Sequence, residues 1–212
     1  MAERITGADL SSARLACVTG VLGALWLLAM IVIGGAAYPG YDHGAQFISE
    51  LGAIDAPHGV EISRYGFLPI GVLACAFSFF AWRATPRTSL GTLGFIGIFL
   101  FSVGYVGSGF FQCDTRCRPN EPSFSQVMHT TIGLAGYMLA PFTLLLLGFA
   151  ARKWPGGGSL SLLAFVGVPI AFVALGFLTP DFAYVGVAQR FLEASVMLWV
   201  VACALYLGRR KH

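Results

Sequence analysis

The chain has 212 residues, of which 57% are hydrophobic and 11% are charged. Soluble domains are about a quarter charged, so this chain has too little charge to cover a water-facing surface. A soluble globular domain is therefore excluded, and we expect an integral membrane protein. The net charge of +3 reflects cations at the ends of apolar runs and gives no reason to expect a nucleic-acid partner.

Six apolar runs are each long enough to cross a hydrocarbon core, which takes about 20 helical residues. Unsatisfied backbone groups are costly in lipid, so runs of this length are predicted to be helices. The expected fold is an all-α bundle of six transmembrane helices in a single membrane domain covering residues 1–212. The helices are predicted at about 14–37, 65–83, 89–111, 126–150, 159–179 and 185–207, with outer loops at 38–64 and 112–125.

The first run follows Arg14 and ends in Gly34–Ala37, which is similar to the cleavage region of a signal peptide. Its apolar stretch exceeds the 7 to 15 residues typical of such peptides. We therefore favour an uncleaved first helix.

Lys and Arg residues are unevenly divided between the two sides of the predicted bundle. The positive-inside rule makes the richer side cytoplasmic, so both termini are expected in the cytoplasm and the loops 38–64 and 112–125 outside the plasma membrane. The poorer side has Arg64, Arg116 and Arg118, with Arg190 just inside the last helix. The richer side has Arg4, Arg14, Arg83, Arg87, Arg152, Lys153, Arg209, Arg210 and Lys211.

The segment 38–64 carries four of the ten acidic residues and two of the four histidines. Pro39-Gly40 breaks the first helix, and Asp42 can cap a short helix that ends at Gly52. That helix would have an apolar side, so we expect an amphipathic lid on the outer surface, lying either on lipid or over a cavity. Its apolar side would be Phe47, Ile48 and Leu51, with Gln46, Ser49 and Glu50 facing away.

The third run carries many small residues, which let neighbouring helices approach closely. Near its outer end Tyr105, Ser108 and Gln112 recur three and four residues apart and share one face. Tyr105 fits either a pocket or an interfacial aromatic belt.

Cys113 and Cys117 lie in the second outer loop. Outside the cytoplasm they can form a disulfide that closes a small loop. A metal site would need more ligands, and no third Cys or His is adjacent in sequence, so we favour the disulfide.

The fourth helix is predicted to begin near residue 124, because Ser123 and Gln126 have the spacing of a capping box. His129 then lies about one and a half turns inside the helix. It is either part of a site or a hydrogen-bond donor to a neighbouring helix.

Gln189, Arg190 and Glu193 fall within the first turns of the sixth helix. Arg190 and Glu193 are three residues apart, so an ion pair between them would reduce the cost of placing each in the membrane. The alternative is that Arg190 reaches the interface and Glu193 is a structural partner. We favour a functional role, the default for ionisable groups inside a membrane.

The string YDHGAQFISELGA at Tyr41–Ala53 resembles the signature of bacterial membrane proteins grouped as domain of unknown function family 998. The pattern continues in Phe111–Cys117, in His129 and in Gly186–Arg190. The resemblance therefore covers nearly the whole chain. It implies a multi-pass membrane protein and carries no function.

A second, shorter likeness joins Gln46–Gly52 to the Tyr-Ile-Ser-Asp-Thr-Gly-like motif of six-helix damage-regulated autophagy modulator proteins. Relatives of these proteins take part in lipid-anchor remodelling. The likeness implies a lipid-related role by analogy only.

The first functional hypothesis is that an outward pocket binds a lipid or small amphiphile, with membrane lipids as partners. Arg190 would hold an anionic headgroup through its planar fork, and Asp42 or Glu50 would orient the polar end. The candidate ligand-binding residues are Asp42, His43, Gln46, Ser49, Glu50, Tyr105, His129, Gln189, Arg190 and Glu193.

The second hypothesis is a membrane-embedded hydrolase or transferase acting on a lipid-like substrate, with Zn²⁺ as a possible cofactor. Glu50 or Glu193 would be its general base, although no metalloprotease or serine-hydrolase motif is present. A third class is a transporter, or a purely structural or assembly protein. The candidate metal ligands of the second hypothesis are Asp42, His43, His58 and His129.

Overall fold

The computed structural model describes residues 7–209. Every regular element within this range is helical, and six helices are long and apolar enough to cross a membrane. This confirms the predicted six-helix, all-α architecture. The predicted cytoplasmic cations Arg4, Arg210 and Lys211 lie outside the described residues.

The second spanning helix combines three elements without a break, one of them a π-helical turn. Two short 3₁₀ helices, η1 and η3, lie in the loops. The elements in chain order are α1 (Gly7–Ala37), η1 (Ile48–Gly52), α2 (Gly59–Glu61), η2 (Ile62–Phe67), α3 (Leu68–Ala84), α4 (Ser89–Phe110), η3 (Thr115–Cys117), α5 (Phe124–Ala151), α6 (Gly158–Gly176) and α7 (Val185–Gly208).

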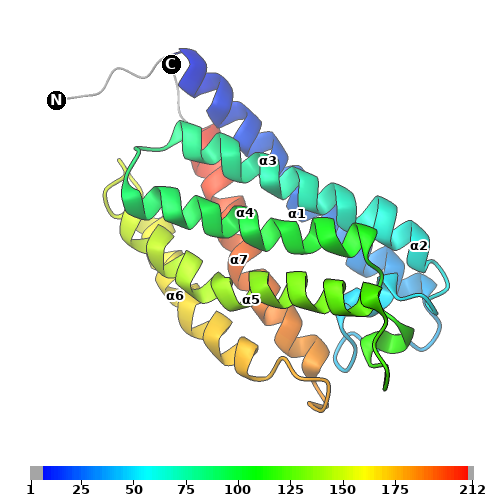
Figure 1. Cartoon of the computed structure of the whole chain (residues 1–212). Helices are drawn as coiled ribbons and strands as arrows, with labels where there is room; N and C mark the ends of the chain where they lie inside the picture. The colour runs from blue at the N-terminus through cyan, green and yellow to red at the C-terminus, as the bar shows by residue number, and fades with distance from the viewer. Residues whose placement is uncertain (1–6, 210–212) are drawn as a thin grey trace.

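The spanning helices lie along one another in a single bundle (Figure 1), and their contacts close into a ring. Each one packs against the next in chain order, and α7 returns to pack against α1. The start of α1 and the end of α7 lie together, since a side chain at Gly208 would contact Cys17. We call this end of the bundle the terminal end, and the opposite end, which carries residues 38–58 and 111–123, the loop end.

Large apolar side chains cover the outside of the ring. On α1 alone Leu25, Leu28 and Ile33 are each more than half exposed. Exposing such side chains to water would cost about 25 cal/mol for each Å² of apolar surface. Lipid removes this cost, so the surface fits a membrane-embedded protein.

The half of the bundle toward the terminal end has a tightly packed core. Phe95 stacks on Trp154 and also contacts Trp199, whose indole nitrogen donates to the carbonyl of Leu160 at 3.2 Å. Between α4 and α5, a Cβ at Gly97 would collide with Thr143. The small residues of the third span therefore bring two helices into close contact, as predicted.

The second spanning helix begins at Gly59, six residues before the predicted start at 65. Glu61 and Arg64 fall in the predicted loop, but both lie on the helix and are exposed. An apolar run marks the part of a helix that lies in hydrocarbon, and a helix continues beyond it where its end is solvated. For the same reason α1 begins at Gly7, before the predicted residue 14.

Candidate functional site

The opening segment, residues 38–58, folds as a series of turns and not as the predicted amphipathic helix. Asp42 Oδ1 accepts from the amide of Gly44 at 2.7 Å, so it caps a turn. The side-chain oxygen of Gln46 accepts from the amide of Asp42 at 2.8 Å. These side-chain bonds to the backbone compete with helix formation. Only η1 is helical, and it ends at Gly52 as expected.

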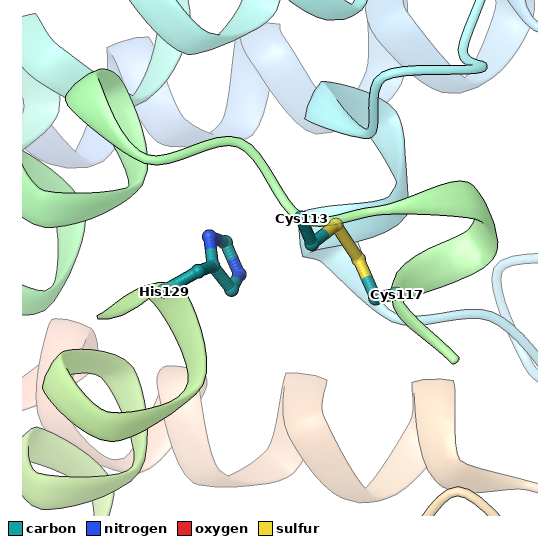
Figure 2. Close-up of side chains that lie close together, drawn as sticks. All are labelled: Cys113, Cys117 and His129. Carbon is teal, nitrogen blue, oxygen red and sulfur yellow. A yellow bond between two sulfur atoms is a disulfide. The ribbon is translucent and has the colours of Figure 1, made fainter. Parts of the chain in front are cut away.

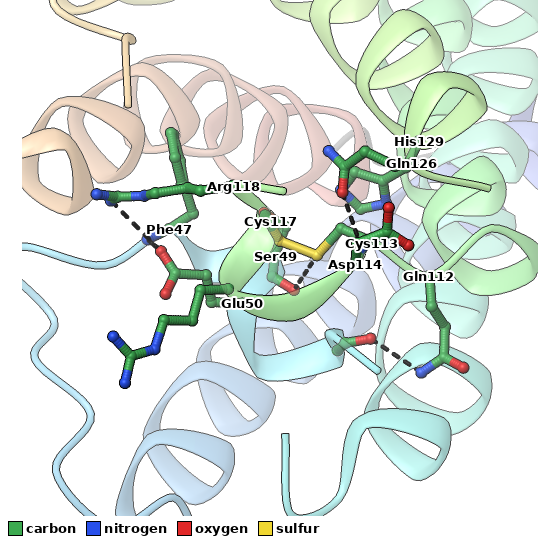
Figure 3. Close-up of a disulfide and its surroundings, with 12 residues drawn as sticks. Phe47, Ser49, Glu50, Gln112, Cys113, Asp114, Cys117, Arg118, Gln126 and His129 are labelled. Atoms are coloured by element: carbon green, nitrogen blue, oxygen red, sulfur yellow. Dashed lines mark hydrogen bonds and ion pairs between the residues drawn. A yellow bond between two sulfur atoms is a disulfide. The ribbon is translucent and has the colours of Figure 1, made fainter. Parts of the chain in front are cut away.

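Glu50 is buried, with 2% of its surface exposed, so the prediction that it faces away from the bundle is wrong. Its carboxylate accepts from the amide of Phe47 at 3.0 Å and from the side-chain amide of Gln46 at 2.8 Å. Arg118 from the second loop lies 3.6 Å from the same carboxylate (Figure 3). Glu50 therefore holds the turn together and joins the two loops.

The second loop, residues 111–123, locks onto the opening segment. The side-chain amide of Gln112 donates to the carbonyl of Gly52 at 3.0 Å, and the amide of Ile54 donates to the carbonyl of Cys113 at 3.0 Å. Cys113 and Cys117 are at disulfide distance, with their Cα atoms 4.9 Å apart (Figure 2). The structure therefore brings the predicted pair to bonding distance.

Arg190 fastens the opening segment to α7. Its guanidinium donates to the carbonyl of Gln46 at 3.1 Å and to the hydroxyl of Tyr41 at 2.9 Å, and it lies 3.0 Å from His43 Nδ1. No ion pair joins it to Glu193 within residues 7–209, so the predicted pairing is wrong. The donor fork of Arg190 finds fixed acceptors in the loop, which satisfy it without a carboxylate.

His43 lies in the exposed part of this junction. Desolvation and the neighbouring Arg190 guanidinium lower the pKa of His43, and Asp42 opposes them. The neutral imidazole can then accept a hydrogen bond from Arg190.

A cavity of about 260 Å³ lies beneath η1, between α4, α5 and α7. Its lining mixes aromatic and aliphatic walls with polar groups that face inward. The apolar and glycine lining comprises Phe47, Ile48, Phe67, Phe101, Gly104, Gly133, Leu134, Leu178 and Pro180. The remaining lining comprises Ser49, Tyr105, Ser108, Cys117, Gln126, His129, Thr130, Tyr137, Gln189 and Glu193.

A chain of hydrogen bonds connects η1 to the acidic group of the cavity. The amide of Ile48 donates to Gln189 Oε1 at 2.6 Å. Gln189 Nε2 donates to the Tyr137 hydroxyl at 2.7 Å, which in turn donates to Glu193 Oε1 at 2.6 Å. These bonds fix one oxygen of the Glu193 carboxylate and leave the other available.

Two buried polar atoms in the cavity wall lack hydrogen-bond partners, Glu193 Oε2 and Tyr105 Oη. Tyr105 and Glu193 are close enough to each other for a weak hydrogen-bonding interaction, but the contact does not have the geometry of a full hydrogen bond, so neither atom is well satisfied. A buried polar atom without a partner costs about 1 to 3 kcal/mol. A donor group bound in the cavity would remove this cost.

The cavity reaches the outer surface of the ring on one side. Thr130 and Leu134 of α5 line it and are exposed, as is Pro180 in the connection from α6 to α7. This part of α5 lies within a membrane-spanning helix. The lateral edge of the cavity therefore faces the region that lipid would occupy.

Five of the ten predicted ligand-binding residues line this cavity and five do not. The lining ones are Ser49, Tyr105, His129, Gln189 and Glu193. The other five lie around the opening segment and its attachment to α7: Asp42, His43, Gln46, Glu50 and Arg190.

The sequence reasoning missed Tyr137, Gln126 and Thr130, which also line the cavity. Together with His129 and Gly133 they follow a spacing of three and four residues along α5. This spacing puts them on one helix face. Extending the face from His129 in both directions would have found them.

The predicted metal ligands do not come together. Asp42, His43 and His58 are exposed, whereas His129 is buried in α5. Within the described part of the chain, Cys113, Cys117 and His129 form a group whose possible ligand atoms all lie within 4.8 Å of one another.

A family model described as "Protein of unknown function (DUF998)" matches residues 21–206. The chain belongs to the DUF998 family. No curated protein and no solved structure matches this DUF998 protein. The likeness of Gln46–Gly52 to the autophagy modulators stays a prediction.

The segments that carried the resemblance to DUF998 meet at the loop end. The amide of Val187 donates to the carbonyl of Gly44 at 3.0 Å, which joins the segment 186–190 to 41–53. Gln112 and Cys113 join the segment 111–117 to the same stretch. His129 lies beside the disulfide of that segment (Figure 2).

Proposed function

We propose that this protein binds the polar end of a lipid-like amphiphile in the cavity beneath η1. The observation that carries the proposal is the pair of unpartnered buried atoms, Glu193 Oε2 and Tyr105 Oη. Both are hydrogen-bonding groups at a cavity whose walls also include Phe67 and Phe101. Binding sites of this kind combine apolar walls with a few polar groups that orient the ligand.

The polar end of the ligand is a hydrogen-bond donor, and a protonated amine fits best. A carboxylate accepts from donors and attracts positive charge. The aromatic rings of Tyr105 and Tyr137 lie beside Glu193, and aromatic faces also attract cations. This replaces the expectation of an anionic headgroup, because Arg190 is bonded to the opening segment and does not line the cavity.

The size and the lateral edge of the cavity favour a ligand that stays partly in the membrane. A volume of about 260 Å³ is close to the lower limit of ordinary ligand pockets, roughly 300 to 1,000 Å³. It suits a headgroup more than a whole lipid. An acyl chain would leave past Thr130 and Leu134 into the surrounding lipid.

Filling the cavity tests the proposal directly. A Cβ at Gly133 would meet no atom within 4 Å, so Gly133→Leu places a side chain in open space that the cavity provides. Gly176→Leu is the matched control, because it also meets nothing within 4 Å and lies exposed at the end of α6. Amphiphiles that copurify in mild detergent are measured by native mass spectrometry. We expect Gly133→Leu to lose them and Gly176→Leu to retain them.

Glu193→Gln tests the chemistry of the polar end. A hydrogen bond to a charged group contributes about 1.5 to 3 kcal/mol, so affinity for an amine amphiphile should fall by roughly tenfold to a hundredfold. Titration with a short-chain amine detergent and with its neutral glycoside counterpart gives the comparison. Equal loss of both ligands, or no loss of either, contradicts an amine-binding carboxylate.

A further inference from the structure

We infer that Cys113, Cys117 and His129 form a thiophilic metal site when the disulfide is reduced. The three residues come from the second loop and from α5, and their possible ligand atoms lie within 4.8 Å of one another (Figure 2). The sequence alone disfavoured a metal here because no third ligand is adjacent to the two cysteines. The fold supplies that third ligand from the neighbouring helix. This inference does not depend on amphiphile binding.

The spacing of the cysteines suits a shared ion. Two cysteines separated by two to four residues are the usual half of a zinc site, and here three residues separate them. Their Cα atoms are 4.9 Å apart. In a tetrahedral site with Zn–S bonds of about 2.3 Å, the two sulfurs lie about 3.8 Å apart, so they must separate once the disulfide is reduced. Side-chain rotation can provide this separation.

The ring of His129 is held as a metal-ligating histidine usually is. Its Nδ1 lies 2.9 Å from the carbonyl of Phe111. This bond puts the proton on Nδ1 and leaves the lone pair of Nε2 free. A second-sphere carbonyl of this kind fixes the tautomer and the orientation of the ligand. Figure 2 shows the far edge of the ring directed toward the disulfide.

The backbone of the loop also has an unusual shape. Arg116 and Cys117 both have positive φ values, 53° and 54°. Non-glycine residues in this region cost about 1 to 2 kcal/mol each and often mark functional positions. The conformation turns Cys117 back toward the cavity, which it lines together with His129.

The site forms when a dithiol reduces the disulfide between Cys113 and Cys117. The dithiol supplies two electrons and two protons, the bond between Cys113 and Cys117 breaks, and the reductant becomes a disulfide. On binding, each thiol releases its proton to solvent and forms one sulfur–metal bond. His129 Nε2 adds the third ligand. Because Cys117 and His129 line the cavity, the cavity would leave room for a fourth, exchangeable ligand, as in catalytic zinc sites.

Cobalt binding tests the inference because Co²⁺ reports its ligands by absorption. The purified protein is reduced, freed of reductant under argon and titrated with Co²⁺. We expect about one ion per chain, with a sulfur-to-cobalt charge-transfer band and the intense visible bands of tetrahedral coordination. Zn²⁺ should displace the cobalt and abolish both. The oxidised protein should show neither band.

Matched variants separate the three ligands from the rest of the chain. His129→Asn retains an amide that can donate to the Phe111 carbonyl but removes Nε2, and His58→Asn is its control at an exposed position. Cys113→Ser is compared with Cys75→Ser, which changes a cysteine in α3. Both controls should bind like the wild type, and both site variants should lose the visible bands or bind at least tenfold more weakly.

Two results overturn the inference. One is a reduced wild-type protein that shows no sulfur-to-cobalt band although circular dichroism shows it folded. The other is a folded His129→Asn variant with the spectrum and affinity of the wild type, because the two cysteines would then bind without the histidine.

Discussion

At the scale of single residues, Gly186 allows the opening segment to pack against α7 because it has no side chain. A Cβ there would approach the carbonyl oxygens of Gln46, His43 and Gly44 too closely for any side chain. The first turn of α7 and the loop backbone therefore touch directly, and this contact places Arg190 within reach of its acceptors. Steric contact with the loop backbone therefore explains why position 186, the first residue of the family-like string Gly186–Arg190, is a glycine.

Replacing Gly186 with Ala should displace the opening segment. Overpacking of this kind costs about 1 to 3 kcal/mol, so we expect a lower thermal midpoint of unfolding in detergent. Gly176→Ala is the control, since its Cβ meets no atom within 4 Å. Equal midpoints for the two variants would show that the contact is not required.

His43 predicts a pH dependence of the same junction. Its pKa in the folded protein is lowered, first by desolvation and then by Arg190, so folding favours the neutral ring. This stabilisation is present above the unfolded pKa of about 6.5 and is lost as pH falls from there through the folded pKa. Protease cleavage within residues 41–47 should therefore increase on acidification. The His43→Gln variant should show a flatter profile, and an unchanged profile would remove His43 as the cause.

At the scale of elements, one tyrosine, Tyr137, connects η1 to the carboxylate of Glu193 in the cavity wall. Tyr137 connects Gln189, which holds the amide of Ile48, to the carboxylate of Glu193. The sequence could not predict this, because Tyr137 lies well down an apolar helix and its partners are more than 50 residues away. Local patterns identify the helix end at Gly52 but not the turns that precede η1, and the burial of Glu50 involves Arg118 from another loop.

Tyr137→Phe tests this coupling. The variant keeps the ring but leaves Gln189 Nε2 and Glu193 Oε1 without their partner, which should destabilise the protein by about 1 to 3 kcal/mol. Chemical denaturation in detergent measures the change. Tyr65→Phe, at an exposed tyrosine, should have no comparable effect; if it has the same effect, the loss cannot be assigned to the buried hydrogen bonds.

At the scale of the whole molecule, the six spans follow from the sequence because lipid permits few alternatives to a helix. Their order around the ring does not follow from it, since the outward and inward faces of α1 are both apolar. The cavity is lined by residues of α4, α5, α7 and η1, which are far apart in the sequence. Its position therefore depends on packing between spans, which composition and spacing do not specify.

The sidedness of the bundle is still a prediction from its cations, and it can be measured. In a background with Cys17, Cys75 and Cys203 replaced by Ala, single cysteines are introduced as His58→Cys at the loop end and Ser89→Cys at the terminal end. Intact cells are treated with a membrane-impermeant maleimide under non-reducing conditions. We expect labelling at position 58 only, and labelling at 89 alone would reverse the assigned orientation.

Because a chain of hydrogen bonds joins η1 to Glu193, hydrogen–deuterium exchange at the Ile48 amide should report on the state of the cavity. Its proton is held by Gln189, whose own position depends on Tyr137 and the carboxylate beyond it. A ligand that binds Glu193 and shifts its carboxylate would change the exchange rate of the Ile48 amide proton. Deuterium uptake at the Ile48 amide can therefore measure the fraction of protein molecules that hold a ligand, without a label on the ligand.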